Sequence, residues 1–184
     1  MNKERNFHKN TYHHLYNRGV NQNQIFFDRE SYLYFLKRMK HYKNKYQIEI
    51  LSYCLMPNHF HIFVKQKTEK LTISNFISAL LNSYVKSINK KYSRSGTLFE
   101  SKTKSKLITD ENYLIWVIKY IIANPVKAKL VSKINDWEYS NAKDLLKLRK
   151  GTLSDINDVK SFFQSEEMMI KFLTDSNIKV NYKF

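Results

Sequence analysis

The stretch Met56–Val64, which reads Met-Pro-Asn-His-Phe-His-Ile-Phe-Val, constrains this chain more than any other. A Pro-Asn pair typical of a turn enters an apolar run typical of a strand. Side chains alternate between the two faces of a strand, so His59 and His61 point to one face and Phe60 points to the other. Two neutral imidazoles on one strand face can bind one divalent metal ion. The same pair is also compatible with two partly exposed sheet histidines, so a metal site needs support from elsewhere in the chain.

The length and composition indicate a globular protein. Its 184 residues, of which 42% are hydrophobic, are enough to bury a core without disulfides. Cys54 is the single cysteine and lies in an apolar run, so we expect a buried reduced thiol and a cytoplasmic protein. The first residues have no apolar segment behind them, which predicts no signal peptide. The apolar stretch 114–123 is short and contains Lys119, so we expect no membrane partner.

The charge points to a polyanionic partner. The chain carries 32 Lys and Arg against 16 Asp and Glu, a formal charge of +16. Residues 1–150 hold 28 of the basic and 11 of the acidic side chains, so this part carries +17. Nucleic acid is the first candidate and an acidic membrane the second. The 15% of aromatic residues favour nucleic acid, because exposed rings stack on unpaired bases.

The first half of the chain is predicted to alternate strands and helices. Residues 12–16 form a strand with Tyr12, His14 and Tyr16 on one face, and a turn at 17–19 ends it. Asp28 or Ser31 caps a helix that runs to about residue 46. Residues 47–55 and the histidine stretch form an antiparallel hairpin, and residues 73–92 form a second helix.

The run 91–106 interleaves lysine, arginine, serine and aromatic residues. This composition is typical of a surface that follows a phosphate backbone and stacks on bases, although a solvated basic loop would look the same. Its basic residues are predicted to contact nucleic acid, together with one arginine from the first turn. The residues are Arg18, Arg94, Lys102, Lys104 and Lys106.

A third helix is predicted from Asp110 through Ala123, where Pro125 stops it. Its core face contains Leu114, Val117, Ile118 and Ile121. At about 100° per residue, Tyr113, Tyr120 and Asn124 share a narrow stripe beside that face. Beyond it, residues 137–141 are predicted to form a packed cap, and residues 141–150 a further helix. The predicted organisation of the chain is a domain of residues 1–145 and a helical extension of residues 146–184 without an assigned role.

Four motifs now stand in a characteristic order and spacing. They are Tyr16-Asn17-Arg18-Gly19, Leu55-Met56-Pro57-Asn58-His59-Phe60-His61, Gly96-Thr97-Leu98-Phe99 and Tyr120-Ile121-Ile122-Ala123-Asn124-Pro125-Val126-Lys127-Ala128. Together, over roughly residues 10–141, they resemble the IS200-like single-tyrosine (HUH) transposases, and more closely the branch called REP-associated tyrosine transposases.

The resemblance implies a ferredoxin-like α+β fold, an antiparallel sheet with helices packed on it, known as the HUH/Y1 transposase fold. It implies an enzyme that binds single-stranded or hairpin DNA, such as inverted repeats, and cuts and rejoins it through a 5′-phosphotyrosine. Mg²⁺ or Mn²⁺ is the implied cofactor. By position, His59 and His61 match the metal-binding pair, Tyr120 matches the nucleophile, and Asn124 stands where a third ligand is expected. Glu100 and Lys129 depart from many relatives, which have Gln and Gly there.

Elementary chemistry agrees with these roles and leaves alternatives open. A tyrosine hydroxyl has a pKa of about 10, so it needs help to act as a nucleophile, and a metal ion can polarise the phosphate that it attacks. Asn124 is also compatible with a helix cap before a proline, and Tyr120 with a tyrosine at the edge of the core. A domesticated, catalytically silent DNA- or RNA-binding protein and a nuclease that uses water are the rival functions. The sequence leaves open a monomer or a homodimer.

Overall fold

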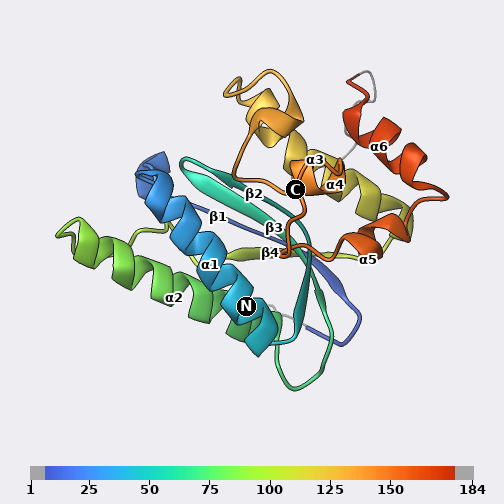
Figure 1. Cartoon of the computed structure of the whole chain (residues 1–184). Helices are drawn as coiled ribbons and strands as arrows, with labels where there is room; N and C mark the ends of the chain where they lie inside the picture. Colours follow the sequence, from blue (N-terminus) through green and yellow to red (C-terminus); the bar gives the residue numbers. More distant parts are fainter. Residues whose placement is uncertain (1–6, 177–184) are drawn as a thin grey trace.

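The turn at Pro57-Asn58 joins β2 (Ile48–Met56) and β3 (His59–Gln66) into the antiparallel hairpin that the sequence predicts. The computed structural model describes residues 7–176 (Figure 1). On its other side β3 pairs with β1 (Tyr12–Arg18), which pairs in turn with β4 (Lys104–Ile108). The sheet therefore has the order β2-β3-β1-β4, with every neighbouring pair antiparallel.

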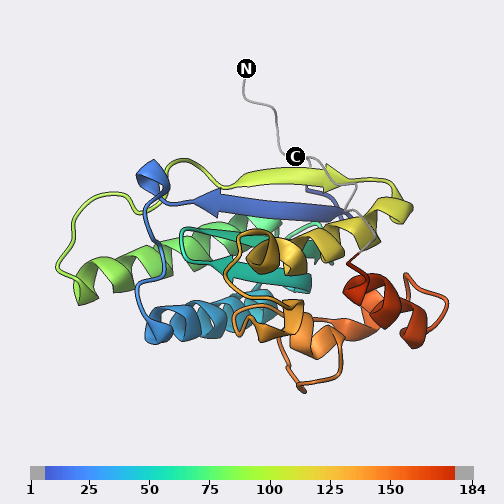
Figure 2. The same ribbon diagram turned by 90° about the horizontal axis from the view of Figure 1, so that it is seen from above.

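Helices cover both faces of this sheet (Figures 1 and 2). α1 (Arg29–Lys45) and α2 (Ile73–Lys91) pack together on one face, and α3 (Glu111–Lys127) packs on the other. The βαββαβ order of β1 to β4, with these strand neighbours, is that of a ferredoxin-like fold. The predicted α+β fold class is confirmed.

Side-chain caps fix where the two long helices begin. Asp28 accepts a hydrogen bond from the Ser31 amide, and the Ser31 side chain bonds back to the cap residue, so both predicted residues form one capping box at the start of α1. Thr72 and Asn75 make the same reciprocal arrangement at the start of α2. These caps satisfy amide groups that the first helical turn leaves unpaired.

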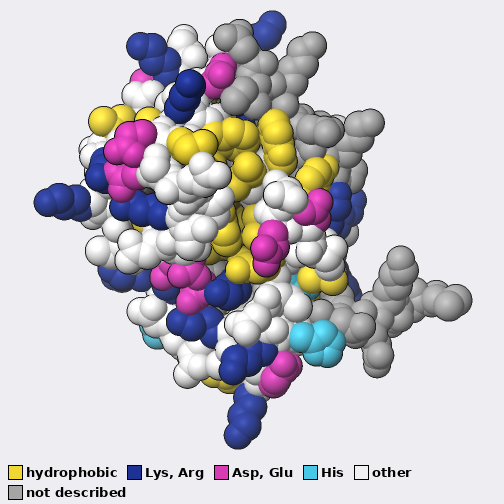
Figure 3. All heavy atoms as spheres, turned by 90° about the vertical axis from the view of Figure 1, so that its right-hand side faces the viewer, with side chains coloured by type: hydrophobic (Ala, Val, Ile, Leu, Met, Phe, Trp, Pro, Cys, Tyr) yellow, Lys and Arg dark blue, Asp and Glu magenta, His cyan; other side chains and the backbone are white. Residues whose placement is uncertain are grey.

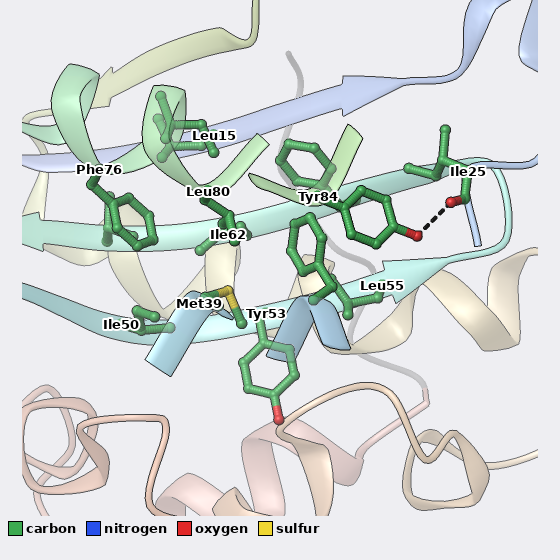
Figure 4. Packing of buried hydrophobic residues seen from close by; sticks show 14 of the residues in the cluster. Leu15, Ile25, Met39, Ile50, Tyr53, Leu55, Ile62, Phe76, Leu80 and Tyr84 are labelled. Atoms are coloured by element: carbon green, nitrogen blue, oxygen red, sulfur yellow. Dashed lines mark hydrogen bonds between the residues drawn. The ribbon is translucent and has the colours of Figure 1, made fainter. Parts of the chain in front are cut away.

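The sheet separates two hydrophobic clusters. The first lies between the sheet and α1 and α2, where Phe35, Phe60, Phe76 and Tyr84 are fully buried (Figure 4). The Tyr84 hydroxyl donates to the Ile25 carbonyl at 2.6 Å, so this ring is buried with its polar end satisfied. The second cluster lies on the α3 side and holds the predicted core face of that helix.

The basic run 91–106 ends in β4, which begins at Lys104 as an edge strand that pairs with β1. Two predictions about local structure are wrong. Pro125 does not stop the third helix, which continues to Lys127. The helix predicted over 141–150 is only α4 (Ala142–Leu145), because the chain turns at Lys147, whose φ is +59°.

The segment after α3 is anchored to the edge strand β2. Trp137 donates its indole N–H to the Leu55 carbonyl, and the Asn141 amide bonds the backbone of Leu51 and Tyr53. These bonds cover the edge of the sheet, where unpaired backbone groups would otherwise be exposed. The predicted packed cap at 137–141 is confirmed.

The last described residues form α5 (Ile156–Lys160) and α6 (Glu166–Thr174). Val159, Met169 and Leu173 from this segment are buried in the second cluster beside α3. The side of the molecule seen in Figure 3, which is the right-hand side of Figure 1, mixes basic and acidic side chains around a band of hydrophobic ones. No helix within residues 7–176 is long and apolar enough to cross a membrane.

Candidate functional site

The two histidines of the organising stretch lie at the start of β3, on the face that α3 covers. Their ring centroids are 5.1 Å apart. His61 is 4% exposed, and His59 is partly buried. Burial lowers the pKa of His59 to about 4, with the Arg18 charge adding to the shift, and burial beside two other histidines holds the pKa of His61 well below its usual value. Both imidazoles are therefore neutral near pH 7, which is the form that binds metal ions.

Strand β1 places further side chains beside the histidines. In the antiparallel register Tyr16 lies opposite His61 and Arg18 lies opposite His59. His14, one step further along the same face, has its Nε2 atom 2.9 Å from Nδ1 of His61. His14 is fully buried, and this burial lowers its pKa to about 3. The predicted strand face of Tyr12, His14 and Tyr16 is thus on the same side of the sheet as His59 and His61.

Helix α3 brings Tyr120 to the same place. Its ring lies edge-on to the His61 ring, with centroids 5.5 Å apart, and 6.2 Å from the His14 ring. Burial raises the pKa of Tyr120 to about 12, and the Asn124 side chain partly opposes this shift. The Lys127 ammonium lies 4.6 Å from the centre of the Tyr120 ring. The hydroxyl is thus harder to ionise than that of a solvated tyrosine.

Asn124 explains why α3 passes through a proline. Pro125 has no N–H for the carbonyl of Ile121, four residues before it. The Asn124 amide nitrogen donates to the Tyr120 carbonyl at 2.8 Å and approaches the Ile121 carbonyl at 3.4 Å. The side chain therefore supplies a donor where the backbone lacks one. In this structure the Asn124 side chain is thus bonded to the helical turn that carries Tyr120.

These elements enclose a cleft of about 590 Å³. Its wall includes both histidines and Tyr120, while Asn124 is not among its lining residues. Arg18 lies at the cleft and pairs with Glu100 at 2.5 Å, and Lys104 lies on the same wall with its ammonium 6.0 Å from the Tyr16 ring centre. The cleft is thus a basic hollow whose wall contains the predicted metal-binding pair and the predicted nucleophile.

Two of the other predicted DNA contacts, Lys102 and Arg94, lie outside the lining of the cleft. Lys102 lines a neighbouring groove of about 800 Å³ beside α2, which shares Asn17, Glu100 and Ser101 with the cleft. The Arg94 guanidinium lies 5.3 Å from the Phe27 ring centre, before α1. Lys106 lies on the same face of β4 as Lys104, with its ammonium 6.0 Å from the Tyr113 ring centre. The structure brings Arg18 and Lys104 together and separates Arg94 from them.

Comparison with known proteins agrees with this arrangement. The family model described as "Transposase IS200 like" matches residues 7–124, well over half of the chain. The chain belongs to the IS200-like transposase family. The predicted family is confirmed, and the matched region contains both histidines, Tyr120 and Asn124.

Two relatives of this transposase carry the name of the branch that its motifs resemble. A Haemophilus influenzae protein named as a REP-associated tyrosine transposase is 26% identical over 106 residues, which cover 52% of this chain and 60% of that protein. The chain therefore matches less than two thirds of that relative. A solved structure of a REP-associated tyrosine transposase bound to a REP hairpin superposes with a TM-score of 0.68 at 16% identity, covering 84% of this chain and 94% of that one. This likeness supports the fold.

The chemistry of the cleft fits a divalent metal ion. Within residues 7–176 no three His, Cys, Asp or Glu side chains are grouped closely enough to hold one alone. His59 and His61 nevertheless offer two neutral imidazoles in an open cleft, where oxygen atoms of a phosphate substrate can complete the coordination. Such a site, incomplete without its substrate, is typical of ions that act on phosphates.

Sequence reasoning missed two residues of the transposase site, His14 and Tyr16. Their alternation on one strand face was visible, but no local pattern indicates that β1 pairs with β3 in the register that sets Tyr16 opposite His61. The pairing joins residues 45 positions apart. A second histidine-containing strand next to an H-x-H strand was the available signal.

Proposed function

We propose that this transposase cuts and rejoins single-stranded or hairpin DNA through a covalent bond between Tyr120 and a 5′-phosphate. The observation that carries the proposal is the contact of the Tyr120 ring with His61 inside a cleft that Arg18 and Lys104 make basic. A hydroxyl, two neutral imidazoles and two cations in one wall are what a phosphodiester transesterification requires.

In the proposed reaction, the Tyr120 oxygen attacks the phosphorus atom and loses its proton. The bond between phosphorus and the 3′-oxygen breaks, and that oxygen takes up a proton as a 3′-hydroxyl. Because one phosphodiester replaces another, the reverse attack by a 3′-hydroxyl rejoins DNA and regenerates Tyr120. Mg²⁺ or Mn²⁺ held by His59 and His61 would polarise the phosphate and help the raised-pKa hydroxyl to ionise.

Charge and the relatives support the choice of DNA. The +17 carried by residues 1–150 favours a nucleic acid over a neutral substrate. The related solved transposase was captured with a REP hairpin, so inverted repeats that fold into hairpins are the proposed substrate class here. In this proposal Arg18 and Lys104, which line the cleft, would contact phosphates next to the one under attack.

The decisive experiment looks for the covalent adduct. Wild type, Tyr120→Phe and Tyr113→Phe are incubated with end-labelled hairpin DNA and Mg²⁺ or Mn²⁺, then separated on a denaturing gel. Tyr120→Phe keeps the ring and removes the hydroxyl, so we expect it to fold, bind DNA and form no adduct. Tyr113→Phe is the matched control, because Tyr113 lies two turns earlier on the same helix and should be dispensable.

Other outcomes would identify the rival functions. An adduct lost in Tyr113→Phe but kept in Tyr120→Phe would reassign the nucleophile. Efficient cutting by Tyr120→Phe without any adduct would make the protein a nuclease that uses water. DNA binding by the wild type with no cutting under any metal condition would support a silent binding protein. His59→Ala and His61→Ala should abolish cutting while leaving most DNA affinity, and excess EDTA should do the same.

A further inference from the structure

The H-x-H histidines each have one ring nitrogen held by another side chain. Nδ1 of His59 lies 2.7 Å from the Asn58 side-chain oxygen, and Nδ1 of His61 lies 2.9 Å from Nε2 of His14. A neutral imidazole carries one hydrogen, so whatever fixes that hydrogen on Nδ1 also fixes the lone pair on Nε2. The direction of each contact therefore determines which nitrogen of that histidine can bind a metal ion.

The contact at His59 has one solution. The Asn58 amide nitrogen donates to the Gln22 carbonyl at 3.1 Å, which leaves its oxygen as the atom that faces His59. An amide oxygen only accepts, so Nδ1 of His59 must carry the hydrogen. The lone pair of His59 is then on Nε2.

The contact at His61 has two solutions. If His14 donates from Nε2, the His61 hydrogen is on Nε2, and that nitrogen has no lone pair for a metal. If His61 donates from Nδ1, Nε2 of His61 carries the lone pair, as in His59. Metal-binding histidines typically donate their other N–H to a neighbouring acceptor, which orients the ring and fixes the tautomer.

We propose that Asn58 and His14 are positioning residues that fix His59 and His61 in the same Nδ1–H tautomer, with His14 accepting the hydrogen of His61. His14 thereby acts on the site through His61. The strand register supports this assignment. β1 pairs Tyr16 with His61, and His14 lies one step from Tyr16 along the same strand face. The inference rests on the proposed function for its effect on metal binding, but the tautomers belong to the metal-free protein.

The test measures tautomers before it measures metal. In metal-free protein labelled with ¹⁵N-histidine, long-range ¹H–¹⁵N spectra distinguish a protonated from an unprotonated ring nitrogen. We expect Nδ1–H and bare Nε2 for both His59 and His61 at pH 7.5. A wild-type spectrum with the His61 hydrogen on Nε2 would overturn the proposal directly.

Variants of His14 then test its effect on metal affinity, with Mn²⁺ alone as the probe and EPR as the readout. His14→Phe removes the acceptor and should weaken Mn²⁺ binding about 10- to 100-fold, the usual effect of losing such a partner. His14→Gln restores an acceptor oxygen and should recover most of the affinity. His13→Phe is the matched control, since His13 is also buried on β1 but bonds to Ser105 and Thr11.

Each outcome bears on one proposal. Unchanged Mn²⁺ affinity in a folded His14→Phe would refute the role of His14. If that variant fails to fold, the wild-type spectrum and His14→Gln still decide the question. A wild type with the expected tautomers that binds no Mn²⁺ and forms no DNA adduct would refute the proposed function and leave the tautomer assignment standing.

Discussion

Asn124 shows how one side chain can serve structure where the sequence suggests chemistry. The family resemblance implies a third metal ligand at this position, and that role stays a prediction. Its amide nitrogen is already used on the carbonyls of Tyr120 and Ile121, next to Pro125. Whatever else it does, Asn124 holds together the turn of α3 that carries the proposed nucleophile.

Asn124→Ala should lower the free energy of unfolding by about 1–3 kcal/mol, because it leaves the buried Ile121 carbonyl, which Pro125 cannot bond, without a donor. Asn124→Asp should cost at least as much, since a carboxylate would face carbonyl oxygens. Urea unfolding measures both, and Mn²⁺ affinity is measured on the same samples. Loss of stability with unchanged Mn²⁺ affinity assigns a structural role only; loss of affinity in the folded Ala variant supports the ligand role.

Glu100 is a second residue whose position predicts an effect, in this case on DNA binding. Its carboxylate lies in the cleft wall and pairs with Arg18, so it competes with a DNA phosphate for that guanidinium. Glu100→Gln should therefore tighten DNA binding about two- to fivefold, the modest effect expected of a pair this exposed.

Fluorescence anisotropy with a labelled hairpin measures the change caused by Glu100→Gln. Glu138→Gln is the matched control, because Glu138 also pairs with an exposed arginine, Arg29, on a segment outside the cleft. Equal tightening by both variants would show a general effect of net charge and no competition for Arg18.

At the scale of elements, the edge strand β4 directs its lysine side chains to one face of the sheet. Alternation along the strand puts Lys104 and Lys106 on one face, beside Tyr16 and Tyr113 of the neighbouring elements. Lys102 precedes the strand and faces the groove beside α2. The basic run therefore does not act as one uniform patch.

Lys104→Ala should weaken DNA binding and reduce the slope of log affinity against log salt by about 0.7–1, the value expected for one lost phosphate contact. The measurement is a salt titration of hairpin binding. Lys133→Ala, which removes an exposed lysine near the 3₁₀ turn Ile134–Asp136, is the control. The same slope for Lys104→Ala and wild type would move the DNA path away from the cleft.

For the whole molecule, four buried or partly buried histidines make stability depend on pH. Burial lowers the pKa values of His13, His14, His59 and His61 below the value of about 6.5 expected in the unfolded chain. Below pH 6.5 the unfolded chain therefore binds more protons than the folded one. Stability is complete above pH 6.5 and falls as the pH drops toward the folded-state values near 4 and 3.

Urea unfolding at pH 7.5, 5.5 and 4.5 should show this loss. A histidine as deeply buried as His14 contributes a decrease of about 1.4 kcal/mol per pH unit within that window. His13→Phe should flatten the dependence without altering the cleft. A free energy of unfolding that stays constant from pH 7.5 to 4.5 would mean that these histidines are hydrated in the folded protein.

The sequence by itself determined the parts of this protein that depend on neighbouring residues. Alternation and the Pro-Asn turn predicted the β2–β3 hairpin and the shared face of His59 and His61, since both follow from local backbone geometry. Helical spacing predicted the core face of α3 and the stripe that holds Tyr120 and Asn124. The four motifs indicated the family, which the comparisons confirm.

Tertiary structure alone decided what lies next to what. Pairing of β1 with β3 brought His14 onto His61, because strand register depends on contacts between residues 47 positions apart. Tertiary packing kept α3 helical through Pro125. The hydrogen bond of the Asn124 amide and the burial of the helix outweigh the tendency of proline to end a helix. β4 exists because β1 offers it an edge, which no pattern within residues 91–106 encodes. Local sequence patterns thus identified the candidate reacting groups, and non-local packing decided which side chains lie next to them.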